Sequence, residues 1–196
     1  MKRLTALAII VFTIFSAHAQ LFKGADKETQ KIEAGAIPVK NGKVTFEETI
    51  PAEGYTAEEV KRAVDAWVKE RFVKPTVISV KQFESDQPET IILKGEEYIV
   101  FKNKFLVLER ARIYYYLTLT ANDGSCTFNM SRITYWYDDE AENGGIKNMK
   151  AEEWITDDMA FDKKGKLKKF EGKFRRKTID LKNQLIEELE KELNSK

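Results

Sequence analysis

The chain has 196 residues, of which 33 are Lys or Arg, 32 are Asp or Glu, one is His and one is Cys. A single cysteine excludes a disulfide scaffold, and a formal net charge of +1 gives no indication of a nucleic-acid partner. Hydrophobic residues make up 42% of the chain, which is enough for the core of about one domain at this length.

The first twenty residues have the layout of a secretory signal peptide. A basic start at Met1-Lys2-Arg3 precedes an apolar stretch from Leu4 to Phe15, and Ala17-His18-Ala19 forms a small-residue cleavage site. The apolar stretch is too short for a transmembrane helix. We therefore expect residues 1–19 to be removed by cleavage after Ala19, which predicts a periplasmic or secreted protein without a transmembrane segment.

The mature chain is expected to begin with a flexible leader, residues 20–36, because this segment is charged and lacks periodicity. A single α+β domain is predicted over residues 37–196. Its first strand follows the Asn41-Gly42 turn, alternates apolar and polar side chains from Val44 to Ile50, and ends at Pro51.

The first predicted helix has the clearest local signature. Thr56-Ala57-Glu58-Glu59 is a capping box, in which the Thr56 hydroxyl and the Glu59 carboxylate can each bind a backbone amide of the other residue. Apolar residues then recur on one helical face, and Pro75 prevents continuation. This face consists of Val60, Ala63, Val64, Trp67, Val68 and Phe72.

Four more strands and two more helices are predicted along the rest of the chain. The strands are Thr76–Phe83, Thr90–Phe101, Phe105–Ala121 and Cys126–Tyr137, the last two joined in a hairpin by Asp123-Gly124. The following segments are an acidic loop at Asp138–Gly145, a short helix at Ala151–Phe161 and a basic run at Lys163–Lys177. We interpret the basic run as a solvated face, with a face toward the acidic loop or toward an anionic envelope polymer as alternatives. Leucines four residues apart predict a final amphipathic helix over about 178–194.

The register of the predicted hairpin divides its side chains between two faces. The apolar face holds Ile113, Tyr115, Leu117, Leu119, Ala121, Cys126, Phe128, Met130 and Trp136. The opposite, polar face is a candidate binding platform, because tyrosines offer large contact area with a polar tip. Its candidate residues are Arg112, Tyr114, Tyr116, Tyr135 and Tyr137. Alternatively, these tyrosines stabilise the sheet across strands, or the segment 138–177 covers them.

Arg132 falls on the apolar face in this register, which indicates a β-bulge or a rim position near it.

The residue types leave few routes to catalysis. A mature chain without histidine excludes Ser-His-Asp and Cys-His catalysis and histidine-ligated zinc. Cys126 lies on the predicted core face, where a free cysteine acts as a small apolar residue. Glycine patterns for phosphate or dinucleotide binding are missing. We therefore predict no catalytic residues, no metal and no cofactor, although a Ser–Lys or carboxylate pair stays open.

Three stretches and one tryptophan resemble a known family. They are Pro38–Val44, Ala151–Asp157, Gly172–Asp180 and Trp67. Together with the order of elements, they are similar to the secreted bacterial domain-of-unknown-function family 4468, over roughly Ile37 to Leu193. The resemblance implies a TATA-binding-protein-like fold: a single curved antiparallel five-stranded sheet with both helices on one face, in the order β-α-β4-α. It brings no catalytic residues, and a shared fold does not transfer DNA binding.

Three functions remain open from the sequence. The first is a secreted or periplasmic binding module that uses the open sheet face, with a protein, an envelope polymer or a small molecule as partner and no nucleic acid. The second is a carrier of a small apolar ligand in a cavity between the sheet and the C-terminal helix, lined by Leu181, Leu185, Leu189 and Trp67. The third is a histidine-independent enzyme.

Overall fold

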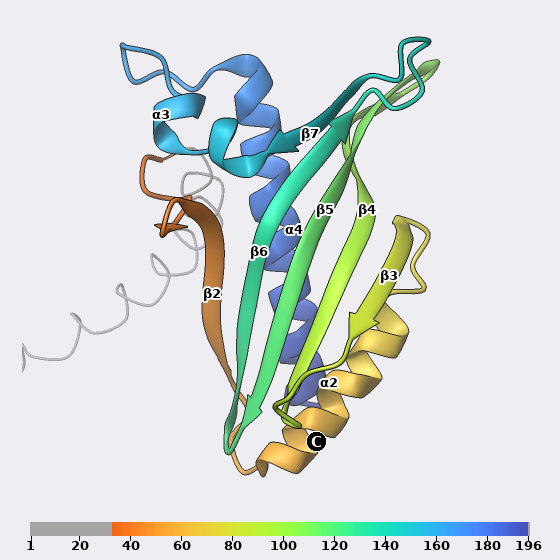
Figure 1. Ribbon diagram of the computed structural model, residues 1–196, viewed down its shortest axis with the longest axis vertical. Helices are drawn as coiled ribbons and strands as arrows, with labels where there is room; N and C mark the ends of the chain where they lie inside the picture. The colour runs from red at the N-terminus through yellow and green to blue at the C-terminus, as the bar shows by residue number, and fades with distance from the viewer. Residues whose placement is uncertain (1–32, 196) are drawn as a thin grey trace, which may run out of the picture. The chain divides into compact units, whose positions relative to one another are not determined.

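An antiparallel sheet with helices on one side forms the part of the chain from Ile37 onward (Figure 1). This computed structural model describes residues 33–195. The expected signal peptide and residues 20–32 of the expected leader therefore lie outside the described residues. The strands are β1 (Val39–Lys40), β2 (Lys43–Pro51), β3 (Val77–Phe83), β4 (Thr90–Lys104), β5 (Val107–Asn122), β6 (Ser125–Tyr137) and β7 (Ile146–Lys150). The helices are α2 (Ala57–Arg71), η1 (Ala151–Glu153), α3 (Asp157–Ala160) and α4 (Lys169–Leu193).

The strands run in the order β1-β2-β6-β5-β4-β3, and β7 pairs with β6. Strand β2 pairs with the first half of β6, as far as Ser131, and β7 pairs with its second half, from Thr134. The predicted class, α+β with one antiparallel sheet, is confirmed. The sheet has seven strands instead of five, because the short strands β1 and β7 extend it at β2 and β6.

Helices α2 and α4 lie behind the sheet in Figure 1 and cover one of its faces. Helix α2 begins at the predicted capping box: the Glu59 amide donates to the Thr56 hydroxyl at 3.3 Å, and the Thr56 amide donates to the Glu59 carboxylate at 2.9 Å. The covered face is apolar, as expected. Leu117 and Phe128 are fully buried there, and Leu119 is 1% exposed.

Helix α4 begins at Lys169, well before the predicted start near Thr178. The predicted start of the last helix is therefore wrong, and the second half of the basic run is helical. Phe170 and Phe174 lie one helical turn apart and pack against each other and against Tyr137. This contact with the sheet extends the helix through a segment that charge alone would leave solvated.

The predicted helix at Ala151–Phe161 is two short pieces, η1 and α3. Thr156 separates them, because its extended backbone, with φ −64° and ψ 163°, interrupts the helical hydrogen-bond series. Strand β7, just before η1, was not predicted. It pairs with β6 and buries Met149, which is 3% exposed.

A β-bulge at Arg132 inverts the second half of β6. Tyr114 pairs with Thr134 and Tyr116 pairs with Ser131, so Arg132 and Ile133 together lie opposite the single residue between them on β5. Arg132 has a φ of 51°. The predicted bulge near Arg132 is thus confirmed, and its extra residue moves every later β6 side chain to the other face.

Because of this inversion, the predicted faces are wrong for the second half of β6. Ile133 and Tyr135 are fully buried on the helix side, and Tyr137 contacts α4 there. Trp136, predicted in the core, lies on the open face beside Arg112. The expectation that Tyr135 and Tyr137 share the open face with Tyr114 and Tyr116 is therefore wrong.

Candidate functional site

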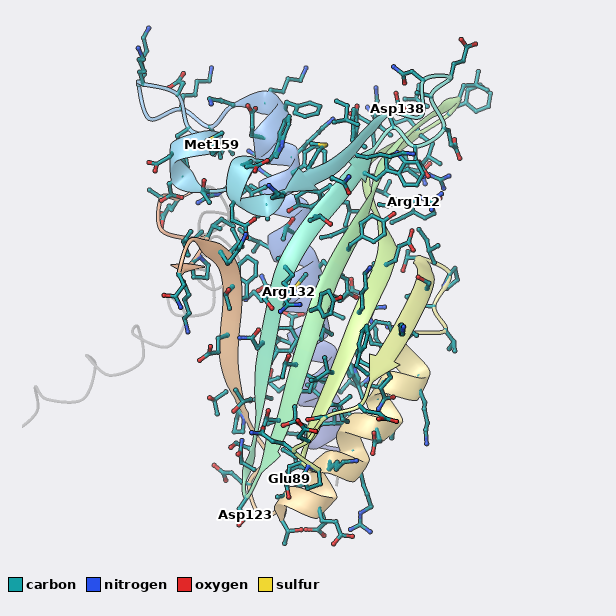
Figure 2. The ribbon with its side chains drawn as sticks, in the orientation of Figure 1. Glu89, Arg112, Asp123, Arg132, Asp138 and Met159 are labelled. Carbon is teal, nitrogen blue, oxygen red and sulfur yellow. The ribbon has the colours of Figure 1, made fainter. Side chains whose placement is uncertain are left out.

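The open face of the sheet retains three of the five candidate residues. Strand β5 places Arg112, Tyr114 and Tyr116 on it, all half-buried. Figure 2 looks onto this face and labels Arg112 and Arg132. Because α2 and α4 pack on the other side, side chains from neighbouring strands surround these residues and leave part of each accessible.

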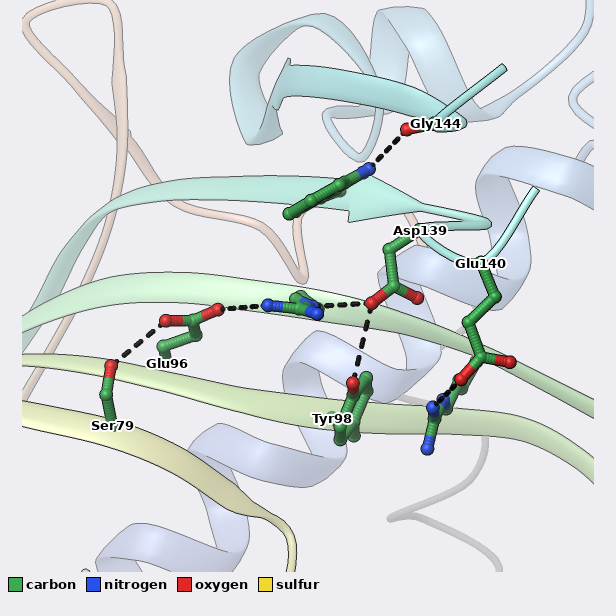
Figure 3. Close-up of polar contacts among 9 residues, drawn as sticks. Ser79, Glu96, Tyr98, Asp139, Glu140 and Gly144 are labelled. Atoms are coloured by element: carbon green, nitrogen blue, oxygen red, sulfur yellow. Dashed lines mark hydrogen bonds and ion pairs between the residues drawn. The ribbon is translucent and has the colours of Figure 1, made fainter. Parts of the chain in front are cut away.

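Arg112 is the centre of a polar network on this face (Figure 3). Its Nε donates to Asp139 Oδ2 at 2.6 Å, and its Nη1 donates to Glu96 Oε1 at 3.1 Å. The Ser79 hydroxyl donates to the other oxygen of Glu96 at 3.0 Å. Two carboxylates therefore neutralise Arg112, which makes it an organiser of the face and not a free binding site for an anion.

Aromatic rings hold the two arginines of this region in place. The Arg112 guanidinium lies 4.7 Å from the centre of the Trp136 ring and 5.6 Å from that of Tyr98. Arg110 lies 3.8 Å from the centre of the Tyr98 ring and is paired with Glu140. The Trp136 indole donates to the Gly144 carbonyl at 2.7 Å, so a hydrogen bond and the Arg112 cation over the ring both hold it.

Tyr116 lies further along the same face and forms a second aromatic group. Its ring stacks on Phe83 at 5.9 Å between centroids, with 21° between the planes. The guanidinium of Arg132 lies 5.1 Å from the centre of the Tyr116 ring. The bulge that turns Tyr135 toward the covered face therefore also places the Arg132 cation over Tyr116, which stays on the open face.

The tyrosine hydroxyls of this face can act as donors. Burial, together with the neighbouring Glu96 carboxylate, raises the pKa of Tyr114. Its hydroxyl therefore stays protonated at neutral pH. Between the aromatic groups and the turn at Asp123, the same face carries small hydroxyl and amide side chains, among them Thr118, Thr120 and Asn129. The arrangement suits contact with polar groups and flat apolar groups together.

The covered face holds a separate charged cluster. The Tyr115 hydroxyl donates to Glu97, and Arg71 Nη2 lies 2.8 Å from the same carboxylate. Glu188 of α4 lies 3.0 Å from Arg71 Nε. Arg71 and Glu97 are each 2% exposed, and Tyr115 is fully buried. Burial and the Glu97 charge raise the pKa of Tyr115 well above its usual value. Arg71 and Glu188 line a cleft of about 370 Å³ between α2 and the end of α4, but the buried Tyr115 and Glu97 do not. The ion pairs of Arg71 tie α2 to β4 and α4, so the role of the cluster is structural.

The two displaced tyrosines also have structural partners. The Tyr135 and Thr178 hydroxyls are 2.7 Å apart. Burial raises the pKa of Tyr135, although the hydrogen bond to Thr178 acts in the opposite direction. The Tyr137 hydroxyl donates to Glu109 at 3.0 Å, and the Tyr137 ring packs on Phe170 of α4.

The residues expected to line a cavity for an apolar ligand are packed. Leu185 and Leu189 are fully buried, Leu181 is 6% exposed and Trp67 is 4% exposed. The Trp67 ring packs edge-on against Phe72 at 6.0 Å. The three leucines fill the layer between the sheet and α4 as ordinary core residues, whereas Trp67 also lines a largely charged cleft of about 370 Å³ between α2 and the end of α4.

Sequence reasoning missed four contributors to the open face: Phe83, Tyr98, Trp136 and Asp139. Two of these residues could have been found from the sequence: Tyr98 from the alternation of side chains along β4, and Phe83 from its position at the end of β3. No signal placed Asp139 on Arg112, because that contact depends on how the β6–β7 loop folds back over the sheet. Within residues 33–195, no three His, Cys, Asp or Glu residues are grouped as a metal site. None of the helices in that range is long and apolar enough to cross a membrane.

Comparisons with known proteins agree with this fold. A family model described as a domain of unknown function (DUF4468) with TBP-like fold matches residues 46–136. The crystal structure of a DUF4468 family protein from Bacteroides ovatus matches with a TM-score of 0.72 and 31% identity, covering 82% of this chain and 91% of that one. A TBP-like protein from Parabacteroides distasonis matches with a TM-score of 0.65 and 22% identity, covering 80% of this chain and 96% of that one. No curated protein matches.

Proposed function

This chain belongs to the DUF4468 family, whose domains have a TBP-like fold, and we propose that it is a non-catalytic binding module that recognises its partner through the open face of the sheet. The observation that carries the proposal is the pre-arranged group of aromatic and cationic side chains around Arg112 and Tyr116. These side chains are held by neighbours and are still half-exposed, so little conformational entropy would be lost on binding.

Charge and exposure support a partner that presents polar and flat apolar groups. Arg112 is paired with Asp139 and Glu96, so the face offers tyrosine hydroxyls and ring surfaces, with the exposed Arg132 over Tyr116 as its cation. A protein, an envelope polymer or a small molecule fits this description. A nucleic acid is disfavoured, because the formal net charge of the chain is only +1 and the signal-peptide pattern predicts a secreted protein.

The cellular place of this partner is part of the proposal. The signal-peptide pattern of residues 1–19 favours a periplasmic or secreted protein. An envelope component or a secreted molecule would then meet the open face directly.

A catalytic role has less support. The covered cluster of Tyr115, Glu97 and Arg71 is buried, and Cys126 is a buried thiol whose pKa burial raises to about 12. Tyr115, Glu97 and Cys126 are too deeply buried to meet a substrate in a reactive form.

Site-specific photo-crosslinking tests the proposal. Benzoylphenylalanine replaces Tyr116 on the open face in one variant and the exposed Glu190 of α4 in a matched control. Each protein is irradiated with the envelope fraction of the bacterium that encodes it. We expect a covalent adduct from position 116 that position 190 does not give. Equal adducts at both positions, or none at position 116, would contradict the proposal.

A further inference from the structure

The tip of the β4–β5 hairpin exposes an unusual run of apolar side chains. Phe105 is 91% exposed, Leu106 88%, Val107 44% and Leu108 55%. Phe105 and Leu106 form the turn itself, between the paired residues Lys104 and Val107. Four consecutive apolar residues in water are unfavourable unless another surface covers them.

The turn also keeps Leu106 in a backbone conformation that a large side chain disfavours. Its φ is 60°, in the left-handed region where glycine and asparagine are the usual residues. Glycine at this position would remove the strain and the exposed apolar surface together. A strained leucine at the apex of a hairpin therefore indicates that the side chain itself has a role.

Cationic side chains line a cleft next to this tip. A cleft of about 640 Å³ lies between the hairpin and the first turns of α4, with an aromatic wall that includes Tyr137 and Phe170. Among its described lining residues, five are cationic and only Glu109 is acidic, and Lys173 already binds Glu109. The cationic residues are Lys102, Lys104, Lys169, Lys173 and Arg176.

We propose that this end of the domain docks on an anionic phospholipid surface, with Phe105 and Leu106 inserted among the lipids and the cleft cations bound to lipid phosphates. This docking is independent of recognition by the open face. Apolar insertion and a basic patch are two separate signals, and stable attachment to a membrane surface requires two such signals.

The shape of the tip favours a membrane over a protein partner. A projecting hairpin needs a matching hole in another protein, whereas a lipid layer deforms around it. A second copy of this chain would bring its lysines against the lysines of the first, which disfavours self-association through this end.

Acidic side chains at the same end are partly neutralised. The β6–β7 loop reaches the level of the hairpin tip in Figure 1. Two of its carboxylates, Asp139 and Glu140, are paired with Arg112 and Arg110, whereas the exposed Asp138 and Glu142 enter none of the ion pairs of the described residues. The four cleft cations other than Lys173 thus outnumber the unpaired carboxylates of this loop.

Vesicle co-sedimentation of the chain without residues 1–19 tests the proposal. Vesicles of phosphatidylcholine alone are compared with vesicles that also contain phosphatidylglycerol, at low and high salt. We expect binding to the anionic vesicles only, weakened by salt because the phosphate contacts are screened. Leu106→Asn and Phe105→Ser should each reduce binding by about tenfold or more, since each removes an inserted apolar side chain.

Controls separate a membrane role from a structural one. Val73→Ser removes an apolar side chain that is 79% exposed just after the C-cap of α2 and should leave vesicle binding unchanged. Leu106→Asn should keep or raise the unfolding midpoint, because asparagine tolerates the left-handed backbone. Lys102→Glu combined with Lys104→Glu should abolish the preference for anionic vesicles.

Several outcomes would overturn the proposal. They are absence of binding to anionic vesicles at low salt, unchanged binding by Leu106→Asn, and competition by inorganic phosphate at constant ionic strength, which would indicate a site for a soluble anion. A dimer in analytical ultracentrifugation that Phe105→Ser dissociates would instead assign the tip to contact between two copies.

Discussion

The two sides of the sheet each hold a tyrosine, a glutamate and an arginine in contact, with opposite consequences. The covered face holds Tyr115, Glu97 and Arg71, and the open face holds Tyr114, Glu96 and Arg112. Tyr115 and Tyr114 are consecutive on β5, and Glu97 and Glu96 are consecutive on β4. The covered group is almost completely buried, whereas about a quarter of the Arg112 side chain is exposed. Burial, and not residue type, therefore decides which group is structural and which is available to a partner.

The largest expected difference between the faces comes from removing one carboxylate from each. Glu97→Ala leaves Arg71 buried without its main partner, and losing one member of a buried pair costs about 3–5 kcal/mol. Glu96→Ala removes a partner from the half-exposed Arg112, which costs about 1 kcal/mol or less. Urea unfolding of both variants measures the two free energies. Equal losses would mean that the faces do not differ in this way.

A glycine on the covered face provides a second test. A Cβ on Gly95 would lie 2.6 Å from Cζ of the Tyr115 ring. Gly95→Ala should therefore destabilise the domain by about 1–3 kcal/mol, as overpacking of a core does. Lys94→Ala, at the exposed neighbouring position, should change the unfolding free energy little. A Gly95→Ala protein as stable as the parent would contradict the close packing of Tyr115.

Removing the hydroxyl groups of the tyrosines on either side of the bulge should give a smaller difference in stability. Tyr135→Phe removes the hydrogen bond with Thr178 and should cost about 1 kcal/mol. Tyr116→Phe removes a hydroxyl from the open face, where water replaces what is lost, and should be nearly neutral. Thermal unfolding of the two variants measures both effects. The reverse order would restore the face assignment expected from simple alternation.

This pair of tyrosines also shows how far the sequence could predict the structure. Alternation placed Leu117, Leu119 and Phe128 on the covered face correctly. It failed after Arg132, because one extra residue reverses all later positions, and the register indicated a bulge or a rim position there without deciding between them. The open-face site was therefore predicted in part, from strand β5 but not from β6.

The prediction errors at the start of α4 and at β7 have a different cause. The first turns of α4 are rich in lysine, and their helical structure depends on Phe170 and Phe174 packing against Tyr137, a long-range contact. Strand β7 exists because the second half of β6 has a free edge. Both features follow from tertiary contacts that no local pattern contains.

The smallest expected effect concerns Cys126, which lies on the covered face. Burial raises the pKa of its thiol from an ordinary 9.0 to about 12. The folded protein should therefore not react with a thiol reagent at pH 8, and unfolding in urea should expose the thiol. Because the unfolded thiol releases its proton at lower pH than the folded one, its contribution to stability is complete below pH 9 and falls as pH rises through this range. Rapid labelling of the folded protein would contradict its burial.

The most direct test of the open face as the recognition surface is nitration of tyrosines, mapped by mass spectrometry with and without the envelope fraction. We expect Tyr116 to be nitrated in the free protein and protected when the fraction is present, while Tyr115 and Tyr135 stay unmodified in both samples. Nitration of Tyr135 in the folded protein would contradict the face assignment. Equal nitration of Tyr116 with and without the fraction would contradict recognition through the open face.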